Sequence, residues 1–239
     1  MLEDKSKKKA LVTGATRGIG LSVAKRLLKD NIEVISTGTK HNGLHAEGSS
    51  YLQVDFLDKN STEEFLRVIK DEPIDILVNN AGINRIDKFT EIKEQDFDEI
   101  LQVNLKAPFL IAQTVIKNMQ LKNWGRVINI ASIFSKVSKE HRASYSASKF
   151  AIDGLTAAMS AEFSGSNILV NTVSPGFIDT DLTRRILGES GIGKIKDSIP
   201  SKRLGDSEEI SAFISWLVSE ENTYISGQNL TIDGGFTRV

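Results

Sequence analysis

Short apolar stretches alternate with longer segments of helical spacing along most of this 239-residue chain. Each short stretch is bounded by turn residues and predicts a buried strand, whereas the longer segments place apolar residues every three or four positions, as helices do. Strands and helices in this order form parallel βαβ units, so we predict an α/β fold with one doubly wound parallel sheet and helices on both faces. The predicted strands are 10–12, 32–37, 51–54, 74–78, 126–131 and 168–173, with a last short strand and turn over 230–235.

The segments of helical spacing predict five helices. One begins at the turn that ends with Gly20, and the others cover 61–71, 96–121, 145–163 and 208–219. Pro108 predicts a break or kink in the long third helix, because proline cannot donate a helical hydrogen bond. In 61–71 we expect Phe65, Val68 and Ile69 to face inward. The apolar residues at helical spacing in the next two helices are Phe97, Ile100, Leu101, Leu105, Phe109, Ala112, Ile116, Phe150, Leu155 and Met159.

Charge and composition exclude several classes of function. The chain has 30 basic and 31 acidic residues, so no global field attracts nucleic acid or an anionic membrane. No apolar run approaches the roughly 18 residues of a membrane span, and we expect a cytoplasmic protein. The lack of cysteine excludes disulfides and thiol catalysis, and three scattered histidines do not predict a metal site. No repeat or linker is present, so we expect a single domain over 1–239.

The first predicted strand runs directly into a glycine-rich turn that opens the first helix. Gly14 permits a tight turn, while Gly18 and Gly20 allow backbone amides and the helix N-terminus to approach a pyrophosphate closely. The spacing differs from the common G-x-G-x-x-G pattern. A tight strand-to-helix connection without a ligand is the alternative interpretation.

The end of the second predicted strand bears on which dinucleotide would bind. A carboxylate there would hold the ribose hydroxyls of NAD and repel the 2′-phosphate of NADP, but no acid occurs within 36–41. Arg17 in the glycine-rich turn could reach that phosphate, with Thr37, Thr39 and Lys40 as further donors. We therefore predict NADP(H) in preference to NAD(H), the alternative for Arg17 being a solvated surface arginine.

Polar and small residues follow several other predicted strands, at the edge of the sheet where doubly wound folds bind ligands. Asp55 could accept from an adenine amino group or cap a turn, and the amides of 79–82 favour either a close backbone approach to a flat ligand or an Asx turn. Asn104, among apolar neighbours, is either a core hydrogen-bond hub or a group aimed into a site. Pro175 and Gly176 turn the chain after the sixth strand.

Ser132, Tyr145 and Lys149 form the candidate catalytic group. In a helix, Tyr145 and Lys149 lie on one face a single turn apart. A phenol has a pKa of about 10, and we expect the nearby ammonium to lower that pKa towards working pH, where proton transfer is efficient. Ser132 would supply a second hydroxyl for the same substrate oxygen. The pair alone is weak evidence, because Tyr-x-x-x-Lys also occurs by chance.

Two further segments concern the substrate. Residues 177–202 are polar and interrupted by glycine, which favours a lid beside the ligand site. The segment between Ser132 and Tyr145 carries an unusual number of charges, namely Lys136, Lys139, Glu140, His141 and Arg142. A solvated loop is one interpretation. If His141 or Arg142 faces the cleft instead, a polar or anionic substrate such as a sugar derivative is indicated.

Taken in order, these residues resemble the classical short-chain dehydrogenase/reductase family over essentially the whole chain. The resemblance rests on Thr13-Gly14-x-x-x-Gly18-Ile19-Gly20, Asn79-Asn80-Ala81-Gly82, Asn104, Ser132, Tyr145-x-x-x-Lys149 and Pro175-Gly176. It implies a Rossmann fold with seven parallel strands, a tetrameric assembly, and NAD(P)-dependent interconversion of alcohols and carbonyls. Within the family, Arg17, Gly205 and the Gly234-Gly235 ending look most like bacterial 3-oxoacyl-acyl-carrier-protein reductases of fatty acid biosynthesis.

The resemblance also implies roles for individual residues. Tyr145 would be the general acid, Lys149 would lower its pKa and bind the nicotinamide ribose, Ser132 would orient the substrate oxygen, and Asn104 would hold a water that links Lys149 to solvent. The implied cofactor contacts are Gly14, Thr16, Arg17, Gly18, Ile19, Gly20, Thr37, Thr39, Asp55, Asn80, Ala81, Gly82, Tyr145, Lys149, Pro175, Gly176, Ile178 and Thr180.

One departure from the family pattern concerns an acyl carrier protein as partner. Reductases of this kind carry a basic residue before the sixth strand, where the carrier docks, and this chain has Ser166 there, although Arg126 matches another basic position. Our leading hypothesis is NADPH-dependent reduction of a 3-oxoacyl thioester. The alternatives are the same chemistry on a sugar, polyol or other polar hydroxy or keto compound, and a non-catalytic dinucleotide-binding sensor.

Overall fold

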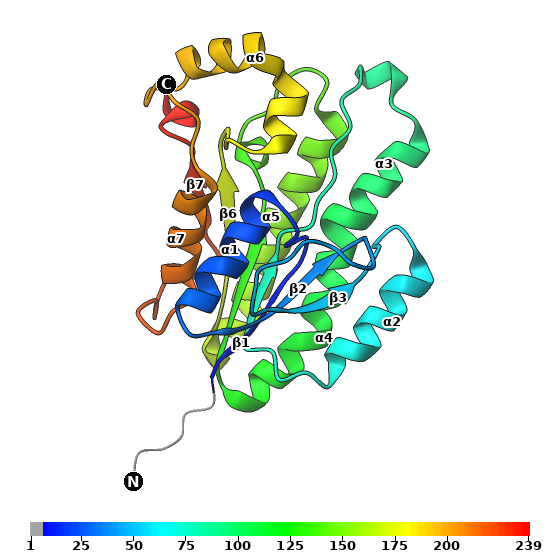
Figure 1. The fold of residues 1–239 in the computed structure, drawn as a ribbon, viewed down its shortest axis with the longest axis vertical. Helices are drawn as coiled ribbons and strands as arrows, with labels where there is room; N and C mark the ends of the chain where they lie inside the picture. The colour runs from blue at the N-terminus through cyan, green and yellow to red at the C-terminus, as the bar shows by residue number, and fades with distance from the viewer. Residues whose placement is uncertain (1–6) are drawn as a thin grey trace.

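Seven parallel strands form one sheet in the order β3-β2-β1-β4-β5-β6-β7 in the computed structural model (Figure 1). The structure describes residues 7–239, so the first six residues of the predicted domain lie outside the described part. The predicted doubly wound α/β fold is confirmed. The strands are β1 (Lys9–Val12), β2 (Glu33–Gly38), β3 (Ser50–Gln53), β4 (Ile76–Asn79), β5 (Gly125–Ile130), β6 (Ile168–Pro175) and β7 (Asn229–Ile232).

Helices cover both faces of the sheet (Figure 1). Helices α1 and α7 pack on one face, and α2, α4 and α5 pack on the other. The helices are α1 (Gly18–Lys29), α2 (Lys59–Lys70), α3 (Glu94–Leu101), α4 (Ala107–Lys122), α5 (Ala143–Phe163), α6 (Asp181–Ser198) and α7 (Ser207–Leu217). Single turns occur at η1 (Phe89–Glu91), η3 (Ile133–Ser135), η4 (Ser164–Ser166) and η5 (Phe236–Arg238), and η2 (Gln102–Lys106) is a π-helical segment.

The apolar runs of the central strands follow from burial on both sides. Ala10 and Val12 of β1 point into the core under α1 and α7, whereas Leu11 between them points into the core under α2 and α4. Side chains alternate between the two faces of a strand, so a strand covered on both faces is apolar at most positions.

The order of the strands reverses at β1. This strand pairs with β2 on one side and with β4 on the other, and Val12 lies opposite both Ser36 and Val78. The loops that leave β1 and β4 therefore begin side by side. In doubly wound sheets this reversal is where ligands bind.

The long helix predicted over 96–121 is interrupted close to Pro108, as the sequence indicated. The π-helical segment Gln102–Lys106 separates α3 from α4 and ends two residues before Pro108, which lies in the first turn of α4. The predicted inward position of Val68 was wrong, because this side chain is partly exposed, as are the apolar residues Phe97, Phe109 and Phe150.

The predicted lid segment, 177–202, is more ordered than its composition suggested. Most of it forms α6, which lies over the carboxyl edge of the sheet (Figure 1) and is broken at Gly188, where φ is 63°. Ile178 and Ile199, at the two ends of the segment, are buried. No helix in the described part of the chain is long and apolar enough to cross a membrane.

Candidate active site

The three predicted catalytic side chains meet at the carboxyl end of β5. The Nζ of Lys149 donates a hydrogen bond of 2.8 Å to the carbonyl oxygen of Ile130, the last residue of β5, and lies 5.5 Å from the centroid of the Tyr145 ring. Ser132 follows β5 by two residues and begins the turn η3, where its Oγ accepts from the amide of Phe134. Helix α5 thus carries the phenol and the ammonium past the strand end that presents the hydroxyl.

Burial sets the ionisation of this group. The pKa of Lys149 falls from 10.5 to about 8, because removal from water disfavours the ammonium. The pKa of Tyr145 lies above 10.0 for the same reason, and the Ser132 hydroxyl and Arg142 guanidinium only partly oppose this. The prediction that Lys149 lowers the pKa of Tyr145 was therefore wrong for the protein alone. The ammonium is directed at the Ile130 carbonyl, and desolvation of the phenolate dominates.

Asn104 is a hydrogen-bond hub within the π-helical segment. Its Oδ1 accepts from the amide of Ile83, and its Nδ2 donates to the Ile83 carbonyl and to Ser148 Oγ. A Cβ placed on Gly82 would lie 3.3 Å from this Oδ1 and 3.7 Å from Lys149 Nζ. The Asn104 side chain thus ties the segment after β4 to α5 beside Lys149, and its implied role in proton resupply stays a prediction.

The glycine-rich turn is held by the segment after β4. Gly14 and Gly18 have positive φ angles of 64° and 52°, which favour glycine. A Cβ on Gly20 would lie 2.4 Å from Asn80 Nδ2 and 2.5 Å from the Gly14 carbonyl oxygen, so only glycine fits there. Asn80 Nδ2 in turn donates to the carbonyls of Thr13 and Gly14. Asn80 therefore braces the turn that would cradle a pyrophosphate.

The predicted phosphate donors differ in exposure. The Oγ1 of buried Thr37 accepts from the amide of Gly14, which leaves its own hydrogen available, so its role as a phosphate donor stays a prediction. Arg17, at the N-cap of α1, and Thr39 and Lys40, after β2, are exposed. The first turn of α1 contains no acid. A glycine-lined helix N-terminus with an exposed cation and no carboxylate fits a dinucleotide that carries an additional phosphate.

The remaining predicted cofactor residues lie along the same edge of the sheet, but several are engaged. One carboxylate oxygen of Asp55 caps the amide of Leu57, as in the turn alternative. Ile178 is a core residue, and Thr180 caps α6 through the amide of Thr183. The Cβ that Gly18 lacks would lie 3.4 Å from Thr180 Cγ2, so the start of α6 contacts the glycine-rich turn. Thr16, Ile19, Ala81, Pro175 and Gly176 occupy the loops and strand ends between them.

The two residues proposed to face the substrate differ in position. His141 is exposed, with a positive φ of 63°, whereas Arg142 is only 7% exposed although it precedes α5. The Cζ of Arg142 lies 5.5 Å from the centroid of the Phe134 ring, and that ring meets Tyr145 edge-on. Arg142 therefore lies beside the candidate site and His141 at the surface of the loop, and the substrate contacts of both stay predictions.

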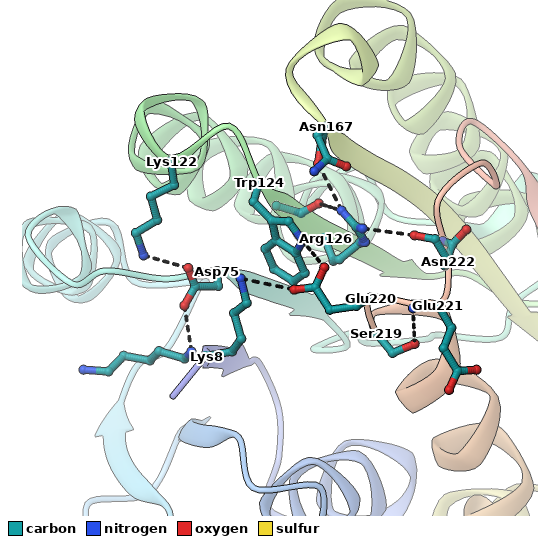
Figure 2. A network of polar contacts seen from close by, with 12 residues as sticks. Lys8, Asp75, Lys122, Trp124, Arg126, Asn167, Ser219, Glu220, Glu221 and Asn222 are labelled. Atoms are coloured by element: carbon teal, nitrogen blue, oxygen red, sulfur yellow. Dashed lines mark hydrogen bonds and ion pairs between the residues drawn. The ribbon is translucent and has the colours of Figure 1, made fainter. Parts of the chain in front are cut away.

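Arg126, the other basic position of interest, lies at the opposite edge of the sheet (Figure 2). Its side chain is buried, stacks on Trp124, and donates to the carbonyls of Gly125, Asn167 and Asn222. Burial lowers the pKa of this guanidinium. Arg126 therefore joins β5 to the loops before β6 and after α7, and it is not exposed for a carrier protein to contact.

The sequence interpretation missed a polar ladder that holds α5 to the sheet. Asn79 donates to Asn129, and Asn129 and Thr172 both donate to the hydroxyl of Thr156 on α5. These residues are buried on β4, β5, β6 and α5. The signal available was a polar residue inside each of three apolar strands, since buried polar groups require partners.

Thr13 was also missed as a site residue. Its Oγ1 accepts from the amides of both Asn80 and Ala81, which joins the end of β1 to the end of β4. Within residues 7–239, no group of three or more His, Cys, Asp or Glu residues could hold a metal ion.

Comparison with known proteins decides the family. The model of the short chain dehydrogenase family matches residues 8–190, which include the glycine-rich turn and Ser132, Tyr145 and Lys149. The chain belongs to the short-chain dehydrogenase family. Oxidoreductase chemistry and the predicted Rossmann fold are thereby confirmed for this short-chain dehydrogenase.

Relatives of this short-chain dehydrogenase act on different substrates. The 3-oxoacyl-[acyl-carrier-protein] reductase FabG of Vibrio cholerae is 36% identical over 240 residues, which cover 97% of this chain and 98% of the relative. The structure of a gluconate 5-dehydrogenase from Burkholderia cenocepacia with NADP and tartrate superposes with a TM-score of 0.88 at 27% identity, covering 97% of this chain and 96% of the other. The structure of ElxO with NADP superposes with a TM-score of 0.89 at 31% identity, covering 98% of this chain and 100% of the other.

Proposed function

We propose that this protein uses NADPH to reduce a ketone to a secondary alcohol and catalyses the reverse reaction with NADP⁺. The observation that carries the proposal is the convergence of Tyr145, Ser132 and Lys149 at the carboxyl end of β5, beside the glycine-rich turn. Bound NADPH would supply a hydride to the carbonyl carbon. A proton must then reach the carbonyl oxygen for the alcohol to form.

Tyr145 is the residue suited to deliver that proton. Since its pKa lies above the ordinary value, the phenol stays protonated at neutral pH and can donate to the substrate oxygen. The Ser132 hydroxyl, next to the phenol, would hold the same oxygen. Lys149, with a pKa of about 8, can carry or release a proton near physiological pH. A Tyr145→Phe variant that retains biological activity would instead support the non-catalytic sensor.

NADP(H) is the proposed cofactor, in preference to NAD(H). Arg17 and the absence of a carboxylate after β2 support this preference, and NADP is present in the two solved relatives described above. We expect the parent protein to bind NADPH more tightly than NADH, and Arg17→Ala to lose most of that preference while NADH affinity is kept. Titration with NADPH and with NADH, followed by the fluorescence of the bound cofactor, measures both affinities in each protein. Equal affinity of the parent for the two cofactors would contradict the argument.

Two substrate classes are candidates. The 36% identity to a 3-oxoacyl-[acyl-carrier-protein] reductase over nearly the whole chain favours a 3-oxoacyl thioester. Two features of this chain favour a polar hydroxy or keto compound, namely the buried position of Arg126 together with Ser166, and the presence of Arg142 beside the candidate site. The solved gluconate 5-dehydrogenase, with its bound tartrate, represents this second class.

A substrate panel separates these candidates. NADPH oxidation is followed with acetoacetyl thioesters of coenzyme A and of acyl carrier protein, and with polar ketones such as 5-ketogluconate. Turnover of the thioesters alone supports the first candidate, and turnover of the polar ketones alone supports the second. If no ketone or thioester oxidises NADPH, the proposed reaction is wrong.

We further propose that the protein is a homotetramer, as the sequence resemblance implied, and that α6 acts as a lid, as the composition of 177–202 indicated. Phe109 on α4 and Phe150 on α5 support an assembly, because they are 43% and 48% exposed on the outer surface of the molecule. The glycine break at Gly188 supports movement of α6. Light scattering of the purified protein tests the tetramer, and the cytoplasmic location stays a prediction.

A further inference from the structure

We propose that the substrate carries a carboxylate near the reacting ketone and that Arg142 binds this carboxylate. The substrate class is therefore an oxo acid, reduced to the corresponding hydroxy acid. This inference rests on the proposed ketone reduction and specifies its substrate. It makes Arg142 a specificity-determining residue, separate from the proton donor Tyr145.

The first observation is that the Arg142 side chain is largely buried while its guanidinium has no hydrogen-bond partner among the described residues. The side chain is 7% exposed and its Nε is buried without a hydrogen bond, whereas its Nη atoms are not among the buried atoms that lack a partner. No hydrogen bond or ion pair joins them to another residue within 7–239. An arginine always carries its charge in a protein and offers five N–H donors. The Nη groups therefore reach the surface beside the site and are available to an acceptor from outside the chain.

Arg126 provides an internal comparison. It is also a buried arginine, with 2% exposure, but it donates to three backbone carbonyls and stacks on Trp124 (Figure 2). This is how the fold accommodates a structural arginine. The Nε atoms of both arginines lack a hydrogen bond and both guanidinium groups lie over an aromatic ring, but only Arg126 donates through its Nη atoms. The Nη donors of Arg142 are therefore left for a ligand.

The second observation is that Arg142 lies near the reacting group. Its charge lowers the pKa of Tyr145 slightly, as the smallest of three contributions that burial dominates. Its Cζ lies 5.5 Å from the centroid of the Phe134 ring, whose edge-on partner is Tyr145 at 6.3 Å between centroids. The guanidinium therefore lies on the same side of α5 as the phenol that would protonate the ketone.

Local charge also favours an anion. Arg142 precedes the first turn of α5, which contains no acid, and Lys149 is buried less than two turns further along the same helix. The N-terminus of a helix carries partial positive charge, which disfavours a cation and favours an anion. A carboxylate matches the planar fork of a guanidinium and would be held by two parallel hydrogen bonds.

The test compares matched pairs of ketones in the parent protein. The probes are 3-oxobutanoate and 4-oxopentanoate, each against its methyl ester, so that only the charge of the acid group changes. One of the two oxo acids will be the better substrate. For that acid we expect a kcat/KM about 10- to 100-fold higher than for its methyl ester. Equal rates for acid and ester, or a preference for the esters or for acetoacetyl thioesters, would overturn the inference and leave ketone reduction in place.

Variants then assign the preference to Arg142. Arg142→Gln should lose most of the acid preference, measured as the ratio of kcat/KM for the acid to kcat/KM for its ester, whereas Arg142→Lys should recover part of this preference because it restores the charge without the fork. Lys139→Gln, at an exposed lysine of the same loop, is the matched control and should keep the parent's preference. An unchanged preference in Arg142→Gln would contradict the proposal.

Calorimetric titration of the NADP⁺-loaded protein with the same acids provides a readout that does not depend on turnover. The parent should bind the oxo acid that is the better substrate more tightly than its methyl ester, and Arg142→Gln should lose this difference in affinity. If the protein turns over no ketone but this difference in binding is found, the acid site stands and the proposed reaction fails. If neither acid is bound more tightly than its ester, the inference is wrong.

Discussion

Replacement of Lys149 by methionine tests the energetic reasoning about the site most directly. The pKa of the ammonium falls from 10.5 to about 8 on burial, so at pH 7 keeping this group charged costs the folded protein about 3 kcal/mol. Between the two pKa values the unfolded chain binds more protons than the folded one, and stability therefore rises with pH. At pH 9 the cost is reduced to about 2 kcal/mol.

The wild type should thus gain about 1.3 kcal/mol of unfolding free energy relative to Lys149→Met between pH 7 and pH 9. Because the pKa of Tyr145 is raised, its phenol stays protonated between pH 7 and pH 9 and does not contribute to this difference. Urea denaturation of both proteins at pH 7, 8 and 9, at one protein concentration, measures the difference. Lys139→Met, at an exposed loop position, controls for the loss of one positive charge. Parallel pH dependences of the wild type and Lys149→Met would refute the argument that burial determines this pKa.

Three further predictions concern the acid, the glycine-rich turn and the opposite edge of the sheet. Tyr145→Phe should lower kcat by about 10²- to 10⁴-fold while the affinity for NADPH, measured by fluorescence, changes little. Gly20→Ala should destabilise the protein by about 1–3 kcal/mol in urea denaturation, because the new Cβ would overlap Asn80 Nδ2 and the Gly14 carbonyl oxygen. A stability equal to that of the wild type would mean that the turn can shift without cost. Arg126→Gln should lower the unfolding free energy by about 3 kcal/mol, because it removes hydrogen bonds to three backbone carbonyls. The ratio of the KM for the carrier-bound thioester to the KM for the coenzyme A thioester should stay unchanged. A selective increase in the KM for the carrier form would instead return Arg126 to a docking role.

The sheet and its catalytic edge could be predicted because local pattern and global fold agree in this chain. Every predicted strand is present within a few residues, and Gly14, Asn80 and Ser132 follow strands whose parallel order places their ends together. The placement of Tyr145 and Lys149 on one helix required only that the segment be helical.

What the sequence could not predict depends on packing between distant segments. Helical spacing identifies an apolar face but not what covers it, so Val68 was expected to face inward and is partly exposed. The contact of the Thr37 hydroxyl with the amide of Gly14, a residue 23 positions away, could not be read from the sequence either. The direction of the Tyr145 pKa depends on desolvation, which spacing does not reveal.

The polar ladder from Asn79 to Thr172 has a consequence for how the protein could change its substrate. It fixes α5 to the sheet through Thr156, well away from residues 139–141, the exposed tip of the loop that carries Phe134 and Arg142. That tip can therefore accept substitutions and insertions while the proton donor keeps its position. We expect directed evolution confined to this tip to yield new substrate ranges at nearly constant fold stability, because the chemistry and the choice of substrate are anchored in different parts of the molecule.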